Sequence, residues 1–343
     1  YVLFFDYRER EKDVAKFSKP NVKIKFYPFS DYKKFLPGAY NEILGAATLA
    51  KENLDVVHTT SPLSRIPASY RGKTIVTVNN VAAYKTPDAF PKLSVMKHKT
   101  ILKFMVSKAD KVIAVSDSIK KDLHDALACP EEKISVIYSG FDKRFSENQS
   151  AQKERVMQKF GLENKKYILF LGTLEPAKNI SRLLEAFKIF KEKRNDYKLV
   201  LAGKNGWLSA EYRQMVKDLE IEEDVIFTGY VVGDEIGSLF AQADFFILPS
   251  LYEGFGTTVL EAFASGTPAI VSNVSSIPEI AGDAAEFVNP LDVQNIAGAM
   301  LKLSEDENLK QSLREKGKKQ IEKFNWEKCA RETLAVYKSF EKK

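Results

Sequence analysis

The stretch Pro249–Pro268, which reads PSLYEGFGTTVLEAFASGTP, decides the fold of this chain. Directly before it, Phe245–Leu248 is a short apolar run that is typical of a buried parallel strand. Within it, Val259–Ala264 has helical composition, and Gly266 and Pro268 are stop signals for a helix. The pattern therefore predicts a strand, a loop and a helix in direct succession.

The loop between this strand and helix has the residues of an anion site. Gly254 and Gly256 allow a tight turn and a close approach to another molecule. Such a turn leaves unpaired backbone N–H groups at the positive end of the helix, where a phosphate can bind. Two carboxylates, Glu253 and Glu261, bracket this position. The loop fits a nucleotide-sugar diphosphate, although an ordinary turn with two solvated glutamates has the same residues.

The whole string resembles the Glu-x7-Glu signature of family 4 retaining glycosyltransferases, with Glu253 and Glu261 in the two glutamate positions. The resemblance implies an α/β protein of GT-B architecture. In that architecture two Rossmann-like, doubly wound parallel-sheet domains face each other across a cleft, and a C-terminal helix crosses back to the first domain. The polar segment Ser146–Lys159 fits a domain boundary. We therefore expect an acceptor-side domain at residues 1–146, a nucleotide-sugar domain at 147–325 and the crossover helix at 326–343.

The remaining chain alternates between strand-like and helical patterns, as expected for mostly parallel sheets. Ligands of such sheets bind beyond the carboxyl ends of the strands. The expected strands are Val2–Phe5, Val22–Phe26, Val56–His58, Thr74–Val78, Lys111–Val115, Ile134–Ile137, Tyr167–Leu171, Leu199–Gly203, Val225–Thr228, Phe245–Leu248, Ala269–Ser272 and Ala285–Val288. The expected helices include Tyr40–Glu52, Thr100–Ala109 and Ser181–Lys193.

Three motifs of the first half are similar to those of the family. D-V-V-H corresponds to Asp55–His58, A-D-x-V-I-A-V-S to Ala109–Ser116, and V-I-x-N-G-x-D to Val136–Asp142. The family usually has His-Asp after the next strand, where this chain has Asn79 and another Asn. Because Asn can bond a sugar hydroxyl but cannot titrate, a mechanism that relies on a histidine there is in doubt. His58 is the other candidate near the cleft, although a strand-end imidazole bonded to the backbone fits equally.

The loop after the strand Tyr167–Leu171 is a second candidate phosphate site. Gly172–Asn179 resembles the family's G-T-L-E-P-R-K-N loop, in which the lysine contacts the phosphates. That lysine is Lys178, which is also compatible with an exposed cation on an ordinary loop. Ala177 stands where arginine is usual, so one cation is expected where the family often has two.

The resemblance implies a complete set of site residues. We expect Lys178 and the amides of residues 256–258 to stabilise the leaving diphosphate, Glu253 to bind donor-sugar hydroxyls and Glu261 to bind the ribose. The catalytic candidates are Glu253, Lys178, His58 and Asn79. The donor-binding candidates are Gly172, Thr173, Lys178, Gly229, Tyr230, Val231, Gly254, Phe255, Gly256, Thr257, Thr258 and Glu261. We expect no metal and no cofactor other than the donor substrate.

The predicted activity is transfer of a hexose, with retention, from a nucleotide diphosphate sugar to a hydroxyl of a glycan or glycolipid. The Leu174–Pro176 loop resembles that of mannosyltransferases of surface-polysaccharide synthesis, which favours GDP-mannose over a UDP-sugar. Two alternatives remain open. One is a sugar-nucleotide epimerase of the same fold, and the other is a non-catalytic or partner-dependent subunit. In the family a strand, a glycine-rich loop and a helix usually precede a strand like the one at Val2, so we expect that these are truncated or lacking.

Charge and composition restrict the partners. The net charge is +6, and the excess of basic residues lies within residues 1–150. Lysines alternate with apolar residues along Lys85–Lys111, which fits a surface that contacts anionic lipid, or a solvated helix face. No recognition motif accompanies the charge, so nucleic acid is not expected. The two cysteines match no metal spacing, and no apolar run reaches the roughly 18–20 residues of a membrane span. We expect a cytoplasmic enzyme at the inner face of the cell membrane.

Overall fold

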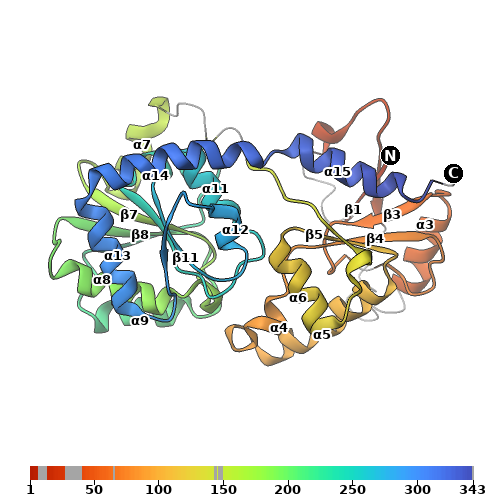
Figure 1. Ribbon diagram of the computed structural model, residues 1–343, viewed down its shortest axis with the longest axis horizontal. Helices are drawn as coiled ribbons and strands as arrows, with labels where there is room; N and C mark the ends of the chain where they lie inside the picture. Colours follow the sequence, from red (N-terminus) through yellow and green to blue (C-terminus); the bar gives the residue numbers. More distant parts are fainter. Residues whose placement is uncertain (7–13, 28–40, 65, 143–144, 146–149, 342–343) are drawn as a thin grey trace.

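The computed structural model describes residues 1–6, 14–27, 41–64, 66–142, 145 and 150–341. These residues form two α/β lobes that lie side by side, each built on a parallel sheet (Figure 1). The first lobe holds the N-terminal half of the chain and the second holds most of the C-terminal half. The GT-B arrangement expected from the sequence is therefore present, and the predicted order of strands and helices is confirmed.

The second lobe has a six-stranded parallel sheet with the strand order β12-β11-β10-β7-β8-β9. Helices cover both faces of this sheet, which explains why its strands are continuous apolar runs. The strands are β7 (Lys166–Leu171), β8 (Tyr197–Ala202), β9 (Val225–Gly229), β10 (Phe245–Leu248), β11 (Ala269–Ser272) and β12 (Glu286–Val288). The helices are α7 (Ser150–Phe160), α8 (Ile180–Lys191), α9 (Ser209–Asp218), α10 (Asp234–Gln242), α11 (Thr257–Ala264), α12 (Ile277–Ala281), α13 (Val293–Glu305) and α14 (Glu307–Gln320), with 3-10 turns η7 (Pro176–Lys178) and η8 (Ile321–Lys323).

The first lobe contains two parallel sheets where the sequence predicted one. Strands β3 (Val56–Thr59), β4 (Lys73–Val78), β5 (Lys111–Ala114) and β6 (Ile134–Val136) pair in that order, while β1 (Val2–Asp6) pairs with β2 (Lys23–Tyr27). The helices are α3 (Ala46–Ala50), α4 (Ala82–Lys85), α5 (Lys92–Lys108) and α6 (Asp117–Leu127), with short turns η2 (Ala15–Phe17), η3 (Asn41–Gly45), η4 (Pro87–Ala89) and η5 (Glu131–Lys133). Helix α5 is longer than expected, and the segment predicted as one helix at 40–52 is divided between η3 and α3.

The polar segment Ser146–Lys159 is mostly helical. Helix α7 begins at Ser150, and its Val156 and Met157 are buried. Two apolar side chains are enough to attach one face of this helix to a lobe. They give too weak a hydrophobic periodicity for a helix to be predicted from the sequence. The predicted boundary at 146/147 lies outside the described residues.

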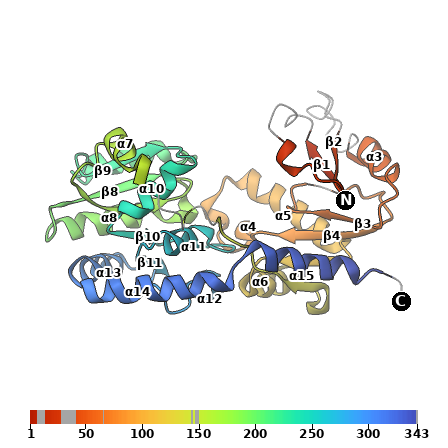
Figure 2. The same cartoon turned by 90° about the horizontal axis from the view of Figure 1, so that it is seen from above.

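The last helix returns to the first lobe. Helix α15 (Trp326–Lys338) lies along the sheet of β3 and β4 (Figure 2). Its Val336 is buried against Ile75 and Ile113 of that sheet and against Ile137, which directly follows β6. At the start of the helix, a Cβ on Gly140 would lie 2.4 Å from the backbone N of Trp326, so the two segments approach as closely as glycine permits.

Candidate functional site

The strand order of the second lobe fixes where a ligand can bind. The order reverses between β7 and β10, which are neighbours although they are not consecutive in the chain. Ligands of doubly wound sheets bind at such a switch point, outside the carboxyl ends of the strands. The loops that leave these two strands, Gly172–Asn179 and Pro249–Gly256, are the two loops that the sequence identified.

Backbone and side-chain hydrogen bonds hold these two loops together. The N–H of Leu251 donates to the carbonyl oxygen of Ala177 at 2.8 Å. The buried side chain of Asn179 donates to the carbonyl oxygens of Pro249 at 3.0 Å and Pro290 at 2.6 Å. Asn179 also adopts a left-handed backbone conformation, with φ of 62°, which asparagine tolerates better than most residues. The loops therefore form one rigid edge.

This edge brings Lys178 and Glu253 into contact. The Nζ of Lys178 lies 2.6 Å from Oε1 of Glu253, and Ser250 Oγ donates to the same oxygen at 2.8 Å. Both charged side chains are mostly buried, with 19% and 12% of their surface exposed. The N–H of Glu253 donates to Ser275 Oγ at 2.9 Å, which fixes the backbone below the carboxylate. A charge pair shielded from water in this way is stronger than one on an open surface.

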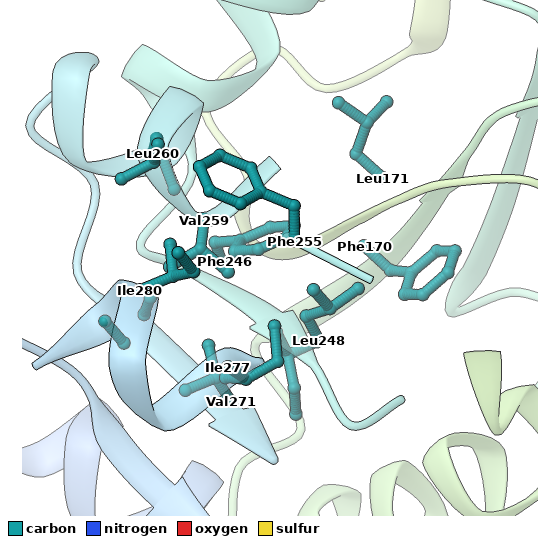
Figure 3. Close-up of a cluster of buried hydrophobic side chains, with 14 of the residues drawn as sticks. Phe170, Leu171, Phe246, Leu248, Phe255, Val259, Leu260, Val271, Ile277 and Ile280 are labelled. Atoms are coloured by element: carbon teal, nitrogen blue, oxygen red, sulfur yellow. The ribbon is translucent and has the colours of Figure 1, made fainter. Parts of the chain in front are cut away.

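The N-terminus of α11 lies next to this pair and is not capped by a side chain. Gly256 precedes the helix with φ of 89°, a conformation that glycine adopts without strain. Beneath the helix start lies a dense apolar layer (Figure 3), formed by Phe246, Leu248, Phe255, Val259, Leu260, Ile277 and Ile280. The amides of Thr257 and Thr258 thus belong to a helix end that is fixed by packing and suited to an anion.

Glu261 lies one turn further along α11. Burial, and to a smaller extent the nearby Asp142, raises the pKa of its carboxyl from 4.5 to about 7. A group with this pKa exchanges its proton near neutral pH. Glu261 can therefore accept hydrogen bonds from hydroxyls when it is ionised, and it loses part of this capacity in mild acid.

The end of β9 and the loop after it carry three further donor-binding candidates. Gly229 has φ of 70°, Val231 is buried, and the ring of Tyr230 is 64% exposed. Lys204, in the loop after β8, places its Nζ 4.5 Å from the centre of the Tyr230 ring. The two loops are joined by a hydrogen bond from Gly203 N–H to the carbonyl oxygen of Gly229. Sequence reasoning missed Lys204, although its position directly after a strand was a usable signal.

Of the two candidates in the first lobe, Asn79 contacts the edge of the second lobe. A Cβ on Gly254 would lie 1.8 Å from the carbonyl oxygen of Asn79, so these two backbones touch. The side chain of Asn79 donates to the carbonyl oxygen of Thr60 at 2.9 Å. The backbone contact between Asn79 and Gly254 joins the first lobe to the loop that carries Glu253.

His58 is bonded to the crossover helix and to the neighbouring strand β4. Its Nδ1 lies 2.7 Å from the hydroxyl of Tyr337 on α15, and its Nε2 lies 2.7 Å from Oγ1 of Thr77. Burial lowers the pKa of the imidazole to about 4, so the ring is neutral at physiological pH. With both nitrogens engaged, His58 attaches the crossover helix to the sheet through two side chains, and not through the backbone partner considered in the sequence analysis.

Glu175 lies in the Gly172–Asn179 loop, and the sequence analysis assigned it no role. Its carboxyl is about half buried, and burial raises its pKa against the opposing effect of Lys178.

Among the described residues, no group of three or more His, Cys, Asp or Glu side chains is placed to hold a metal ion. No helix in the described part of the chain is both long enough and apolar enough to cross a membrane.

Two family models match consecutive parts of the chain. Residues 2–145 match the model described as Glycosyltransferase Family 4, and residues 152–320 match the model described as Glycosyl transferases group 1.

Two curated relatives cover most of the chain. An O-antigen chain mannosyltransferase B from Escherichia coli is 31% identical over 267 residues, which are 78% of this chain and 70% of the relative. An N-acetyl-alpha-D-glucosaminyl L-malate synthase from Bacillus anthracis is 28% identical over 330 residues, 93% of this chain and 84% of the relative.

Solved structures share the fold at lower identity. Sucrose-phosphate synthase from Thermosynechococcus elongatus superimposes with a TM-score of 0.78 at 20% identity, covering 94% of this chain and 84% of the other. Anabaena HepE in complex with UDP-glucose superimposes with a TM-score of 0.75 at 18% identity, covering 98% and 99%.

Proposed function

Because the chain belongs to glycosyltransferase family 4 and is a nucleotide-sugar hexosyltransferase of GT-B fold, we propose that it transfers mannose from GDP-mannose to a hydroxyl of a glycan or lipid-linked acceptor. The observation that carries this proposal is the contact between Lys178 and Glu253 beside the uncapped start of α11. Mannose is favoured by the Leu174–Pro176 loop and by the named activity of the relative from Escherichia coli.

Each group at the edge has a role in this proposal. The diphosphate binds between Lys178 and the amides that open α11, and the ribose hydroxyls bind Glu261. Glu253 accepts hydrogen bonds from hydroxyls of the donor sugar. When the acceptor oxygen attacks the anomeric carbon and the bond to the phosphate oxygen breaks, negative charge develops on the leaving diphosphate. Donors that already point at this charge are the largest single source of catalysis, about 3–4 kcal/mol for one well-placed group.

We further propose that the reaction needs no divalent metal, since Lys178 and the helix end supply the positive charge that a metal would. Addition of EDTA should then leave turnover unchanged. Loss of activity that magnesium or manganese restores would refute this part of the proposal.

The donor assignment is tested by thermal shift, because a ligand that binds only the folded state raises the melting temperature by mass action. GDP-mannose and GDP should raise it more than UDP-glucose and UDP do. Glu261→Ala should abolish the response, whereas Glu163→Ala, an exposed glutamate of the same lobe, should keep it. A normal shift in Glu261→Ala would refute the ribose assignment, and a preference for UDP-glucose would refute GDP-mannose.

Product analysis separates the alternatives. A transferase releases GDP only as the mannosylated acceptor forms or as water takes the acceptor's place. An epimerase would invert a stereocentre of the sugar and leave the sugar attached to the nucleotide. A partner-dependent subunit would bind the donor and show no turnover by itself.

Membrane contact is a second partner proposal, and it concerns the first half of α5. Leu93 and Met96 are 74% and 61% exposed, and they lie among lysines of the same helix. The lysines of this basic patch are Lys92, Lys97, Lys99 and Lys103. Apolar side chains surrounded by cations suit a surface of anionic lipid headgroups, where each lysine contributes about 1 kcal/mol.

Vesicle sedimentation tests this contact. The protein should sediment with anionic vesicles and not with neutral ones, and salt should release it because exposed charges are screened. Replacing Lys92, Lys97 and Lys99 by Gln should abolish sedimentation and leave donor binding unchanged. Equal sedimentation with both vesicle types, or with neither, would show a merely solvated helix face.

A further inference from the structure

Helix α6 of the first lobe holds the loop that carries Glu253, and it does so on both sides of that residue. The hydroxyl of Tyr252 donates to Oδ2 of Asp122 at 2.7 Å. The Oγ of Ser116, the N-cap residue of α6, donates to the carbonyl oxygen of Gly254 at 2.8 Å. Both sequence neighbours of Glu253 are therefore bonded to the same helix of the other lobe.

These contacts are buried polar interactions rather than incidental surface bonds. Ser116 is 0% exposed, Asp122 5% and Tyr252 6%. The other carboxylate oxygen of Asp122 lies 2.9 Å from Nζ of Lys85. A buried carboxylate is costly unless it is paired and hydrogen-bonded, and here both of its oxygens have partners. Burial and the neighbouring Asp122 raise the pKa of Tyr252, which keeps its hydroxyl a donor.

A third contact runs from the second lobe into the start of α6. The carboxylate of Glu279, on α12, accepts hydrogen bonds from the backbone N–H groups of Asp117 and Ser118, each at 3.0 Å. An acidic group at a helix N-terminus satisfies donors that would otherwise lack a partner. The unusual feature is that this carboxylate belongs to the opposite lobe.

The segment that carries Glu279 also holds the backbone of Glu253. Ser275 accepts from the N–H of Glu253, and Ser276 donates to its carbonyl oxygen at 3.0 Å. Helix α6 thus contacts the two neighbours of Glu253 and also the segment that supports its backbone. These contacts, together with the backbone contact between Gly254 and Asn79, hold Glu253 in position relative to the first lobe.

We propose that Ser116, Asp122, Tyr252 and Glu279 are positioning residues, through which α6 aligns Glu253 with the acceptor side and so sets turnover. The inference rests on the proposed function for the chemistry that Glu253 serves. Lys178 and the start of α11, which bind the nucleotide in that proposal, lie wholly within the second lobe. Loss of the contacts with α6 therefore lowers kcat and leaves the affinity for the nucleotide unchanged.

The decisive variant is Tyr252→Phe, which removes one hydroxyl and leaves Asp122 paired with Lys85. Release of GDP from GDP-mannose should fall about tenfold or more, because small displacements of a catalytic group are costly. The dissociation constant for GDP should stay within about twofold of the wild-type value. The matched control is Tyr167→Phe, which also loses a buried hydroxyl, bonded at 2.7 Å to the carbonyl oxygen of Leu239 inside the second lobe. Tyr167→Phe should have a lower melting temperature than the wild type and a normal kcat.

A second measurement needs no donor. In Glu279→Ala, hydrogen exchange at the first amides of α6 and at residues 252–254 should be faster than in the wild type, while β7 and β8 keep their protection. If wild-type protein neither binds nor turns over GDP-mannose, the proposed function fails and this exchange experiment still tests the contacts. Unchanged exchange, normal or raised turnover in Tyr252→Phe, or a parallel loss of GDP affinity would each overturn the inference.

Discussion

At the scale of single residues, the candidate site depends on two side chains that the structure brings into contact from separate loops. Lys178 and Glu253 are 75 positions apart in the chain, and their charged atoms are 2.6 Å apart. The sequence predicted both as site residues, because each lies in a motif after a strand. It did not predict their direct contact, since the neighbourhood of β7 and β10 is a property of the sheet order.

Lys178→Ala should lower kcat by about 10²–10³-fold, because it removes a preorganised donor to the leaving phosphate. The affinity for the guanosine nucleoside should change little. Lys193→Ala, an exposed lysine of the same lobe, should behave like the wild type. Steady-state kinetics and nucleoside titration measure both, and near-normal turnover in Lys178→Ala would exclude the phosphate role.

Glu261 should make donor binding depend on pH. Its pKa of about 7 means that the carboxylate form, which accepts from both ribose hydroxyls, is depleted in mild acid. We expect GDP to bind about tenfold more weakly at pH 6 than at pH 8, and Glu261→Gln to remove this dependence. The contribution of Glu261 to the free energy of unfolding depends on pH in the opposite direction. A raised pKa favours the folded state at low pH, and this contribution is lost as the pH rises through 7. Isothermal titration at both pH values would contradict the assignment if the affinities were equal.

At the scale of elements, close approaches of backbone explain two glycines that the sequence could only associate with a turn. Gly256 needs its left-handed φ to begin α11. Gly254 needs space for another reason, because Asn79 of the first lobe lies against its Cα. A motif specifies the residue type at both positions, whereas only the assembled lobes show which contact requires it.

Gly254→Ala should separate the two lobes at this contact and lower turnover strongly, since its Cβ would overlap the carbonyl oxygen of Asn79. Unfolding of the second lobe should change little. The control is Gly298→Ala, inside α13, where a Cβ would meet no atom within 4 Å. That change should raise stability by about 0.5–1 kcal/mol, the usual gain from alanine in a helix. Wild-type turnover in Gly254→Ala would contradict this prediction, because it would show that turnover does not depend on the close contact between Gly254 and Asn79.

At the scale of the whole molecule, the fold and the two-lobe GT-B arrangement were predictable, and the individual side-chain contacts between the lobes were not. Apolar runs and glycine-bearing loops gave the strands and their order along the chain, because buried parallel strands have a strong local pattern. The bond of His58 to the crossover helix was not predicted, because its partner Tyr337 lies 279 residues away. The pairing of β1 with β2 in a separate sheet and the contacts of α6 are likewise long-range, and no local pattern encodes them.

Removal of α15 should destabilise the first lobe selectively. A chain that ends at Phe324 lacks Val336 against Ile75 and lacks the hydroxyl that bonds His58. The first lobe should then melt at a lower temperature than the second, which gives two transitions in calorimetry. A chain that ends at Phe340 keeps α15 and should melt like the full chain. A single unshifted transition in the shorter chain would contradict the role assigned to this helix.

In the described part of the chain, the backbone passes between the lobes at Phe324–Trp326, and this passage lies against Gly140. Near it, the rings of Tyr138, Phe255 and Phe324 contact one another, with centres 5.6–6.1 Å apart. A single passage packed by aromatic rings is a point about which two lobes can rotate. Phe255 lies at this point, whereas Trp207, which donates to the carbonyl oxygen of Ala89 across the lobes, belongs to another loop. Points far from such a pivot travel furthest for a given angle. The start of α11, which Gly256 alone separates from Phe255, would therefore move little relative to the first lobe when the lobes rotate.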